Sequence, residues 1–499
     1  MRFFTISRLY AASIIGLGAI ALVVACDQTT DTPPETLDMT MSSPPDLTPV
    51  NDLTSFNAPT VTSVTPVSGA NNAPTPIVIT GTDFRAGATV TVGGVACTNV
   101  VFVSATTINC TVPAKAATCG PQDIVVTHPD DQKAGTGTKL FSYRSTGAAS
   151  WAAPVNYATG TGPRRVIAAD INADGKIDLI TVNQTGNNIT VKTGLGDGTF
   201  PNGASQNLSI GATPTGPSDL AMGDFNTDGK PDIATINSNG SITVFTNQGA
   251  TVFTSAIFNT TGFLAGPNAA IAVGDVTADN KLDILVASPA SISVLPLIGA
   301  GNGTFTVGTG RAVGGFVGDL ALADMNKDGK LDIVTANTST LNVTVCLSTG
   351  VGTFGNPINQ NAGTNPSGLF VTDLNGDKAM DVVVANTTST NVSVLLGDGA
   401  GNLGLAQNQP LATNKPESVW VADVTGDKLP DLLTANAGSS NWSLLQGMTP
   451  TVYAAQVATN TGAGPTDITV ADLNGDGLQD IIVASNGSSN VQVSLGICK

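Results

Sequence analysis

The apolar and polar positions of the chain predict many short β-strands. Near the end of the sequence, the apolar run Asp467–Ala471 is followed by a nine-residue polar stretch and then by a second apolar run, Ile481–Ala484. The next run, Val491–Leu495, alternates apolar and polar side chains, as a half-buried strand does. Turns rich in Gly, Ser and Asn separate the runs, and no amphipathic helical pattern interrupts them. This region is therefore predicted to be all-β.

The same succession of strands is repeated seven times between about residue 150 and residue 499. The first Asp of each polar loop follows the previous one by 54, 51, 49, 49, 50 and 49 residues. Repeats of this length indicate a propeller or a solenoid, and four strands per repeat make one propeller blade. We therefore predict a seven-bladed β-propeller over residues 150–499.

The two ends of this region predict how the ring closes. The last repeat reaches Lys499 after its third strand and so lacks a fourth. An orphan strand, Ala153–Ala158, precedes the first repeat. We expect this N-terminal strand to complete the last blade, because the pairing removes an open sheet edge.

Residues 58–143 form a separate region of short β-rich runs and turns. Examples are Pro76–Thr80, Thr89–Val92 and Asp123–Thr127. Their spacing is typical of a small β-sandwich. The predicted fold class is thus all-β, with a small immunoglobulin-like β-sandwich followed by the seven-bladed β-propeller.

The polar loops of the repeat share one arrangement of oxygen-bearing side chains. Each loop is nine residues long with Asp at positions 1, 5 and 9, which accounts for 21 of the 37 acidic residues. Position 3 is Asn in five loops and Thr in two. The candidate metal ligands are Asp170, Asn172, Asp174, Asp178, Asp224, Asn226, Asp228, Asp232, Asp275, Thr277, Asp279, Asp283, Asp324, Asn326, Asp328, Asp332, Asp373, Asn375, Asp377, Asp381, Asp423, Thr425, Asp427, Asp431, Asp472, Asn474, Asp476 and Asp480.

Three carboxylates so close together repel one another unless a cation neutralises them. Calcium suits such a loop, because it takes about six to eight oxygen ligands from carboxylates, amides, backbone carbonyls and water. Up to seven Ca²⁺ ions would change the net charge of the chain from −17 to −3. The alternatives are magnesium, which demands stricter octahedral geometry, and metal-free hairpins closed by Asx turns. Zinc is disfavoured because no His or Cys lies nearby.

The residue at position 6 predicts that the sites differ in strength. Four loops have Gly there, which supplies the positive φ that a sharp wrap needs. The third, fifth and sixth loops have Asn280, Lys378 and Lys428 instead. We expect these three sites to be weaker or looser than the other four.

The N-terminal residues predict export and lipid anchoring. Residues 1–25 combine basic residues with a short apolar stretch, as a secretory signal peptide does; a transmembrane helix, the alternative, needs a longer run. The end of this stretch, Val23–Cys26, resembles a bacterial lipobox, which implies that Cys26 is lipidated and becomes the mature N-terminus. Residues 26–57 are rich in Thr, Pro, Ser and Asp and predict a disordered stalk.

Charge and residue content argue against two classes of function. The net charge of −17 disfavours nucleic acid as a partner, since phosphate binding needs clustered Lys and Arg. The single histidine, His128, lies outside the propeller, which therefore has no nucleophile–His pair. We predict that the protein is not an enzyme. Glycosidase chemistry by paired Asp residues is the alternative, although carboxylates that ligate a metal stay ionised.

The propeller repeats resemble the FG-GAP/VCBS repeat family, whose best-known members are the propellers of integrin α-subunits. Residues such as Ala323–Val334 carry the likeness, which covers all seven repeats. The resemblance implies calcium-binding loops and a role in adhesion or recognition. The Phe-Gly and Gly-Ala-Pro elements of the family are only hinted at, as in Gly352–Pro357, so the likeness does not extend to an integrin-like ligand surface.

Residues 58–143 resemble an IPT/TIG domain. The likeness is carried by Val64–Pro66, Ile79–Gly81, Val92–Gly94 and Phe141–Tyr143. A Cys pair such as Cys97 and Cys110 is commonly bridged in that family, so the resemblance implies a Cys97–Cys110 disulfide, with Cys110–Cys119 as the competing pair. Export permits disulfides, and the odd number of cysteines beyond Cys26 leaves at least one unpaired. Cys346 lies in an apolar strand and is expected to be a buried thiol.

Together these features predict a calcium-binding, lipid-anchored protein of the bacterial cell envelope that acts as a recognition or adhesion module. Its ligand would be a protein or a glycan, and the membrane would be contacted through the N-terminal lipid. The alternatives are a polysaccharide-binding or carbohydrate-active propeller protein and a purely architectural envelope lipoprotein.

Overall fold

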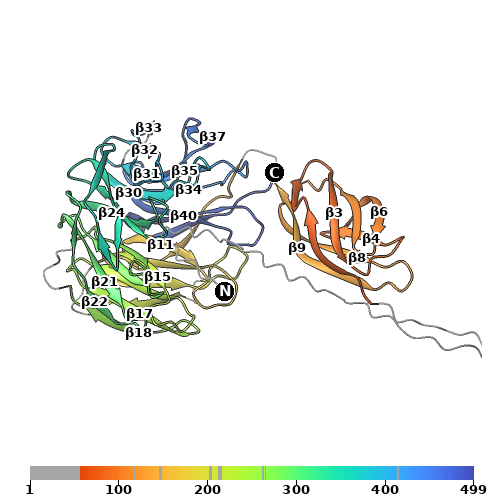
Figure 1. Cartoon of the computed structure of the whole chain (residues 1–499), viewed down its shortest axis with the longest axis horizontal. Helices are drawn as coiled ribbons and strands as arrows, with labels where there is room; N and C mark the ends of the chain where they lie inside the picture. Colours follow the sequence, from red (N-terminus) through yellow and green to blue (C-terminus); the bar gives the residue numbers. More distant parts are fainter. Residues whose placement is uncertain are drawn as a thin grey trace, which may run out of the picture.

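The computed structural model describes residues 57–116, 118–144, 149–201, 205–211, 216–260, 263, 266–412 and 415–499. The predicted signal peptide, Cys26 and the stalk up to residue 56 lie outside the described residues. The described chain forms a small β-domain and a larger ring of β-sheets, seen at the right and left of Figure 1. It contains no α-helix, which confirms the predicted all-β class for this part of the chain. A search of the described residues accordingly finds no helix with the length and hydropathy to cross a membrane.

Two sheets make up the small N-terminal domain. One contains, in order, β1 (Thr60–Thr65), β3 (Thr75–Thr82), β7 (Thr107–Val112) and β6 (Thr98–Ser104). The other contains β2 (Ser68–Ala70), β9 (Ala134–Arg144), β8 (Gly120–Thr127), β4 (Thr89–Val92) and β5 (Val95–Ala96). Alternating positions of both sheets, such as Ile79, Ile124 and Phe141, are buried in one shared core. The predicted β-sandwich is therefore confirmed.

Seven antiparallel sheets, the blades, form the ring. The innermost strands are β11 (Pro163–Ala169), β15 (Pro217–Gly223), β19 (Ala270–Gly274), β24 (Val317–Ala323), β30 (Pro366–Thr372), β34 (Pro416–Ala422) and β40 (Pro465–Ala471). The second strands are β12 (Asp178–Asn183), β16 (Asp232–Asn237), β20 (Asp283–Ala287), β25 (Asp332–Asn337), β31 (Asp381–Asn386), β35 (Asp431–Asn436) and β41 (Asp480–Ser485).

The outer half of each blade completes the meander. The third strands are β13 (Asn188–Lys192), β17 (Ile242–Gly249), β21 (Ser293–Gly299), β26 (Asn342–Cys346), β32 (Asn391–Leu395), β36 (Asn441–Leu445) and β42 (Asn490–Ser494). The fourth strands are β14 (Ser205–Ser209), β18 (Val252–Phe258), β22 (Phe305–Val307) with β23 (Arg311–Ala312), β29 (Ile358–Asn361), β33 (Gln407–Pro410), β39 (Val457–Asn460) and β10 (Val155–Ala158). Small hairpins extend blade four, β27 (Ser348–Gly350) with β28 (Thr353–Phe354), and blade six, β37 (Gly447–Thr449) with β38 (Val452–Tyr453).

The hydrophobic cores of the propeller lie between neighbouring blades. Every residue of the second strand of each blade is buried, because the adjacent blades cover both faces of its sheet. One such core joins blade one to blade seven through Val166, Leu179, Ile482 and Val493. Each blade therefore depends on its neighbours for burial, and the ring is continuous.

The predicted closure of the ring is confirmed. Strand β10 pairs antiparallel with β42, so that Val155 lies opposite Val493 and Ala158 opposite Asn490. Trp151, just before β10, adds a bridge to Gly496 and donates its indole N–H to the Gln479 carbonyl at 3.1 Å. Both ends of the propeller region thus belong to blade seven.

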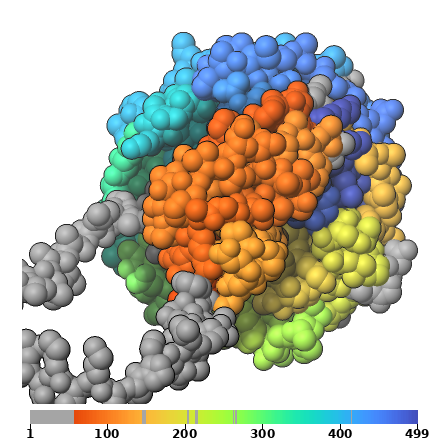
Figure 2. All heavy atoms as spheres, turned by 90° about the vertical axis from the view of Figure 1, so that its right-hand side faces the viewer, coloured from red at the N-terminus to blue at the C-terminus, as the bar shows by residue number. Residues whose placement is uncertain are grey.

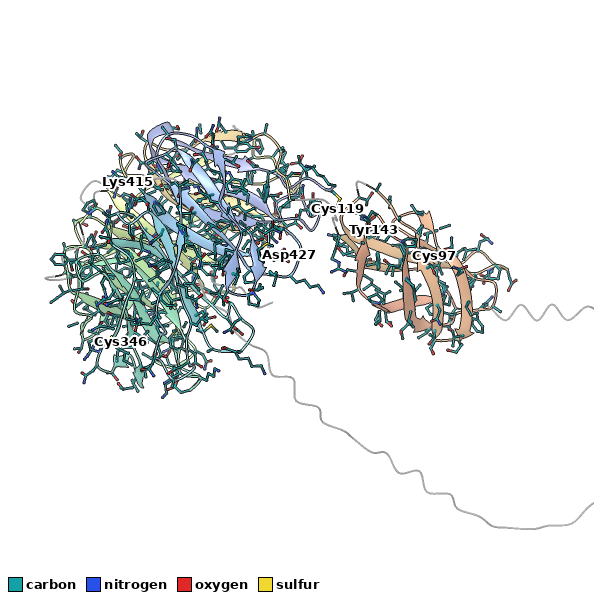
Figure 3. The ribbon with its side chains drawn as sticks, turned by 90° about the horizontal axis from the view of Figure 1, so that it is seen from above. Cys97, Cys119, Tyr143, Cys346, Lys415 and Asp427 are labelled. Atoms are coloured by element: carbon teal, nitrogen blue, oxygen red, sulfur yellow. A yellow bond between two sulfur atoms is a disulfide. The ribbon has the colours of Figure 1, made fainter. Side chains whose placement is uncertain are left out.

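The strand register gives the propeller two distinct faces. In blade one, Ala169 pairs with Asp178 at one end of the sheet and Pro163 with Asn183 at the other. All seven nine-residue loops lie on the first side, which we call the loop face, and the turns between second and third strands lie on the opposite side, the turn face. Blade six illustrates this in Figure 3, where Lys415 and Asp427 lie on either side of the inner strand β34 in the sequence. Asp427, in the loop after β34, lies toward the small domain, whereas Lys415, just before β34, lies on the far side.

The disulfide found in the structure differs from the one that the family resemblance implied. Cys119 is bonded to Cys498, 379 residues away, and Cys97 and Cys110 are free thiols. Cys97 packs against the core that contains Cys110, but the two side chains are not bridged. The implied Cys97–Cys110 bridge and the competing Cys110–Cys119 bridge are therefore both absent. Cys119 pairs elsewhere because closure of the propeller brings the C-terminus beside it. Cys346 is buried, as predicted.

The disulfide holds the small domain against blade seven on the loop face. The Asn71 amide donates to the Lys499 backbone oxygen at 2.9 Å, next to the bridge. Gly120, with φ +82°, packs so closely on the seventh loop that a Cβ there would lie 1.8 Å from the Asp476 carbonyl oxygen. Viewed from this side, the small domain lies in front of the propeller (Figure 2). The turn face is left on the other side.

Candidate metal centres

The first Asp of each loop binds the backbone of the loop that follows it. In the first loop, Asp170 Oδ1 accepts from the Asp174 N–H at 3.1 Å, and Oδ2 accepts from the Gly175 N–H at 2.8 Å. The bond from the position-6 N–H to the position-1 carboxylate recurs in all seven loops at 2.7–2.8 Å. Position 1 therefore sets the curvature of each loop.

Positions 3 and 5 point their oxygens into the same turn. Each of the five Asn residues at position 3 accepts from the position-5 N–H through its side-chain oxygen, as Asn172 does at 2.9 Å. Each position-5 Asp accepts from the position-7 N–H, as Asp174 does from Lys176 at 2.9 Å. The structure thus brings positions 1, 3 and 5 together around one short segment of backbone.

Position 9 has a different environment, which sequence reasoning missed. Its Asp is fully buried in every loop. In blade one, Asp178 Oδ2 accepts from the Ile171 N–H at 3.1 Å and Oδ1 from the Gly194 N–H, beyond the third strand, at 2.8 Å. The same pair of bonds occurs in the other six blades. Position 9 therefore links the loop to the third strand of its blade.

Burial changes the acidity of the position-9 carboxyls. Desolvation, with smaller contributions from the other carboxylates of the loop, raises the pKa of Asp178 to about 6 and that of Asp480 to about 7. The pKa values of Asp232, Asp332, Asp381 and Asp431 are raised to about 6 for the same first reason. A nearby divalent cation would oppose this effect by favouring the ionised form.

The donor atoms fit calcium, although their present arrangement is not a coordination shell. Carboxylate, amide, hydroxyl and backbone oxygens are the ligands that calcium prefers. In the sixth loop the position-3 hydroxyl, Thr425 Oγ1, is buried and has no hydrogen-bond partner within the described structure. Across the described residues, however, no three His, Cys, Asp or Glu side chains are grouped closely enough to hold a metal. The predicted ligand set consequently remains a prediction.

The backbone of the loops needs a positive φ at two positions, and only position 6 was anticipated. Position 6 has φ between +63° and +84° in all seven loops, including Asn280, Lys378 and Lys428. Position 4 also has positive φ in every loop, whether it is Gly, as in Gly376 and Gly426, or not, as in Ala278. The fifth and sixth loops thus have Gly at position 4 instead of position 6. The third loop has Gly at neither.

The seventh loop differs from the others because the small domain covers it. Its position-5 residue, Asp476, is half-buried, whereas the position-5 Asp of each other loop is exposed. Desolvation, first among the causes, raises the pKa of the Asp476 carboxyl. Docking of the small domain therefore affects the burial and the acidity of Asp476 in the seventh loop.

An arginine at the propeller axis is a second polar centre, also missed from the sequence. Arg165 lies 3.4 Å from the Asp219 carboxylate, 3.3 Å from Asp319 and 3.1 Å from Asp467. These Asp residues occupy the position of Arg165 in blades two, four and seven. Each also accepts a backbone N–H from the next blade, as Asp467 does from Val166 at 3.0 Å. The presence of charged residues within otherwise apolar inner strands is the sequence feature from which this cluster could have been predicted.

Comparison with known families agrees with the architecture. The IPT/TIG domain model matches residues 59–143. The FG-GAP-like repeat model matches six overlapping stretches, 170–235, 224–286, 275–335, 324–384, 373–434 and 423–483. None of the curated proteins compared with the sequence matches it.

Solved structures with a similar fold are distant in sequence. An auxiliary nutrient binding protein from Bacteroides ovatus is 14% identical, with a TM-score of 0.42, covering 88% of this chain and 98% of its own. One from Bacteroides thetaiotaomicron is 9% identical, with a TM-score of 0.38 and coverages of 88% and 98%. A protein from Lactobacillus plantarum is 12% identical, with a TM-score of 0.46 and coverages of 69% and 96%.

Proposed function

Since the chain belongs to the FG-GAP-like repeat family and carries an IPT/TIG domain, we propose that it is a calcium-stabilised recognition or adhesion module of the bacterial cell envelope. The observation that carries this proposal is the sevenfold repetition of one loop conformation lined by carboxylate and amide or hydroxyl oxygens. Calcium bound in a loop would favour the folded blade, because the unfolded chain has no preformed site. The candidate ligands are positions 1, 3, 5 and 9 of each loop.

The envelope location is the second part of the proposal. Cys26 at the end of the apolar N-terminal stretch would carry the lipid, and the Thr/Pro-rich stalk would separate the membrane from the folded domains. A disulfide between the two domains suits an oxidising compartment. Labelling with a radioactive fatty acid tests the anchor: we expect incorporation into the wild-type chain and none into Cys26→Ser.

Calcium binding is tested by thermal unfolding and metal analysis of the same preparation. If each site is held about 100-fold above its Kd, each contributes about 2.7 kcal/mol, so EGTA should lower Tm by on the order of 10 °C or more. Elemental analysis after dialysis against Ca²⁺ should find several ions per chain and at most seven. An unchanged Tm together with a metal-free protein would refute the proposal, and recovery of Tm by Mg²⁺ as well as by Ca²⁺ would refute the choice of metal.

A further inference from the structure

A cavity of about 140 Å³ lies on the propeller axis at the turn face. Arg164 of blade one and Glu417 of blade six line it, together with Asn268 and Asn365, which precede the inner strands of blades three and five. The small domain is docked on the loop face, on the opposite side of the ring from this cavity. Arg165 also lines it and, with its three carboxylate partners, lies between it and a smaller axial cavity of about 50 Å³.

Four polar side chains of this cavity lack a direct hydrogen bond or close ion pair among the described residues. Arg164 and Glu417 are half-buried, as is Asn365, while Asn268 is exposed. Across the described residues, none of the four side chains takes part in a hydrogen bond or an ion pair. Such groups are normally satisfied by protein, by water or by a ligand. Their convergence on one cavity offers an unused set of polar contacts to a ligand that displaces water.

The contrast between two adjacent arginines strengthens this interpretation. Arg165 has three carboxylates within ion-pair distance and serves the ring, whereas Arg164 has none that close among the described residues. The Arg164 guanidinium is attracted at longer range, most by Glu417 on the other side of the cavity. Desolvation, followed by repulsion from Arg165, lowers the pKa of Arg164. A desolvated guanidinium gains from any hydrogen-bond acceptor that enters the cavity.

The chemistry of the four groups selects the ligand class. A guanidinium only donates hydrogen bonds, a carboxylate only accepts them, and an amide does both. One positive and one negative side chain cancel, so the ligand needs no net charge. Neighbouring hydroxyl groups meet all of these demands, because each hydroxyl both donates and accepts. We propose that this cavity binds one neutral saccharide unit through its hydroxyl groups.

The size of the cavity is consistent with one sugar ring. Its volume exceeds the roughly 30 Å³ that a water molecule occupies in the liquid by several-fold. It is well below the roughly 300–1,000 Å³ of pockets for drug-sized ligands. Binding of a monosaccharide in such a polar site should be weak, with a Kd on the order of 1 mM. The inference specifies the ligand of the recognition module proposed above, but it does not depend on the identity of the metal.

The test is titration calorimetry of the full chain in calcium-containing buffer with glucose, galactose, mannose and N-acetylglucosamine as probes. We expect at least one to bind. Arg164→Ala and Glu417→Gln should each weaken that binding at least tenfold, while Arg144→Ala, which removes an exposed arginine from the small domain, should not. Unchanged Tm values of the variants would show that they are folded.

The outcomes separate this inference from the calcium proposal. No binding by any of the four sugars, or binding that survives both cavity substitutions, would overturn the saccharide site. Tighter binding of acetate than of the sugars would make it an anion site, and tighter binding of glycine would make it a zwitterion site; either result also overturns it. Metal content and the EGTA-induced change in Tm are measured separately, so calcium binding stands or falls on its own.

Discussion

The two faces of the propeller follow different rules. On the loop face, the same Asp-rich segment occurs in all seven blades and makes the same hydrogen bonds. At the axis and the turn face, equivalent positions carry different residues: Arg165 corresponds to Asp219, Ala270, Asp319, Gly368, Ser418 and Asp467 in the other blades. A feature that every blade needs is repeated, and a feature that the molecule needs once is not. Departures from the repeat therefore mark the candidates for specific function.

The largest effect of a single substitution is expected at the axis. Arg165→Met removes the guanidinium that lies 3.4 Å from the buried Asp219 carboxylate and 3.3 Å from the buried Asp319 carboxylate. Breaking such a buried ion cluster costs about 3–5 kcal/mol. Arg164→Met is the matched control, because it removes a neighbouring arginine that makes no close ion pair among the described residues. Chemical denaturation measures both; equal losses for the two variants would contradict the assignment of Arg165 to the ring.

The disulfide between the domains should have the next largest effect. Cys498→Ser is expected to lower the stability by about 2–4 kcal/mol and to uncouple the sandwich from blade seven. Calorimetry should then resolve two unfolding transitions, while Cys97→Ser, a free thiol, serves as control. A count of free thiols cannot separate this pairing from Cys97–Cys110, since either leaves three of the five cysteines beyond Cys26 free. Peptide mapping of the non-reduced protein can separate the two pairings. A disulfide-linked peptide pair containing Cys97 and Cys110 would contradict the structure.

The third prediction concerns how the stability of the metal-free protein depends on pH, which the buried position-9 carboxyls of the loop face should control. Burial raises the pKa of every position-9 carboxyl above the ordinary value of about 3.9, to about 6 in five loops and to about 7 for Asp480. The folded state therefore binds more protons than the unfolded state between about pH 4 and 7, so stability falls as pH rises through this window. In EGTA, Tm should decrease from pH 5 to pH 7, and Asp480→Asn should flatten the upper part of the decrease.

Calcium should remove this dependence. A bound cation favours ionised carboxylates, so Tm in calcium should stay level or rise from pH 5 to pH 7. The two series, with EGTA and with calcium, should diverge most near pH 7. Parallel series would show that no metal lies near position 9, even if calcium binds elsewhere in the loops.

The sequence predicts the repeat and the strand that the last repeat lacks, but it misses side-chain contacts between residues that are far apart in the chain. Seven copies of one motif were enough to predict the blade count, and the missing fourth strand of the last copy was enough to predict which strand closes blade seven. The Cys119–Cys498 bridge was missed because its partners are 379 residues apart and meet only when the ring is closed. The Arg165 cluster was missed for the same reason, since it joins blades one, two, four and seven. The hydrogen bonds of position 9 to backbone beyond the third strand were missed because these partners are distant in the sequence, for example Gly194 from Asp178.

The smallest expected effect tests whether the seven loops are equivalent in strain as well as in shape. A residue other than Gly at positive φ is disfavoured, and replacing it by Gly there removes the steric cost of its Cβ. Lys378→Gly and Lys428→Gly should each raise the stability by up to about 1 kcal/mol. The third loop should gain most when both of its strained positions are changed, in Ala278→Gly/Asn280→Gly, because it has no Gly at either.

The control for this series is Lys176→Gly, at position 7 of the first loop, where φ is not positive and Gly should slightly destabilise. The prediction that the third, fifth and sixth sites are the weaker ones is then tested with seven variants, each with Asp→Asn at position 1 of one loop. The calcium affinity lost in each variant gives the contribution of that loop. If backbone strain sets calcium affinity, the third loop should bind calcium most weakly, because neither of its positive-φ positions is Gly. The seventh loop, with Gly475 and Gly477 at these positions, is the least strained. The fifth and sixth loops, with one Gly each, should bind calcium no more weakly than the first. Weak fifth and sixth sites despite their position-4 Gly would instead assign the difference to the charge of Lys378 and Lys428.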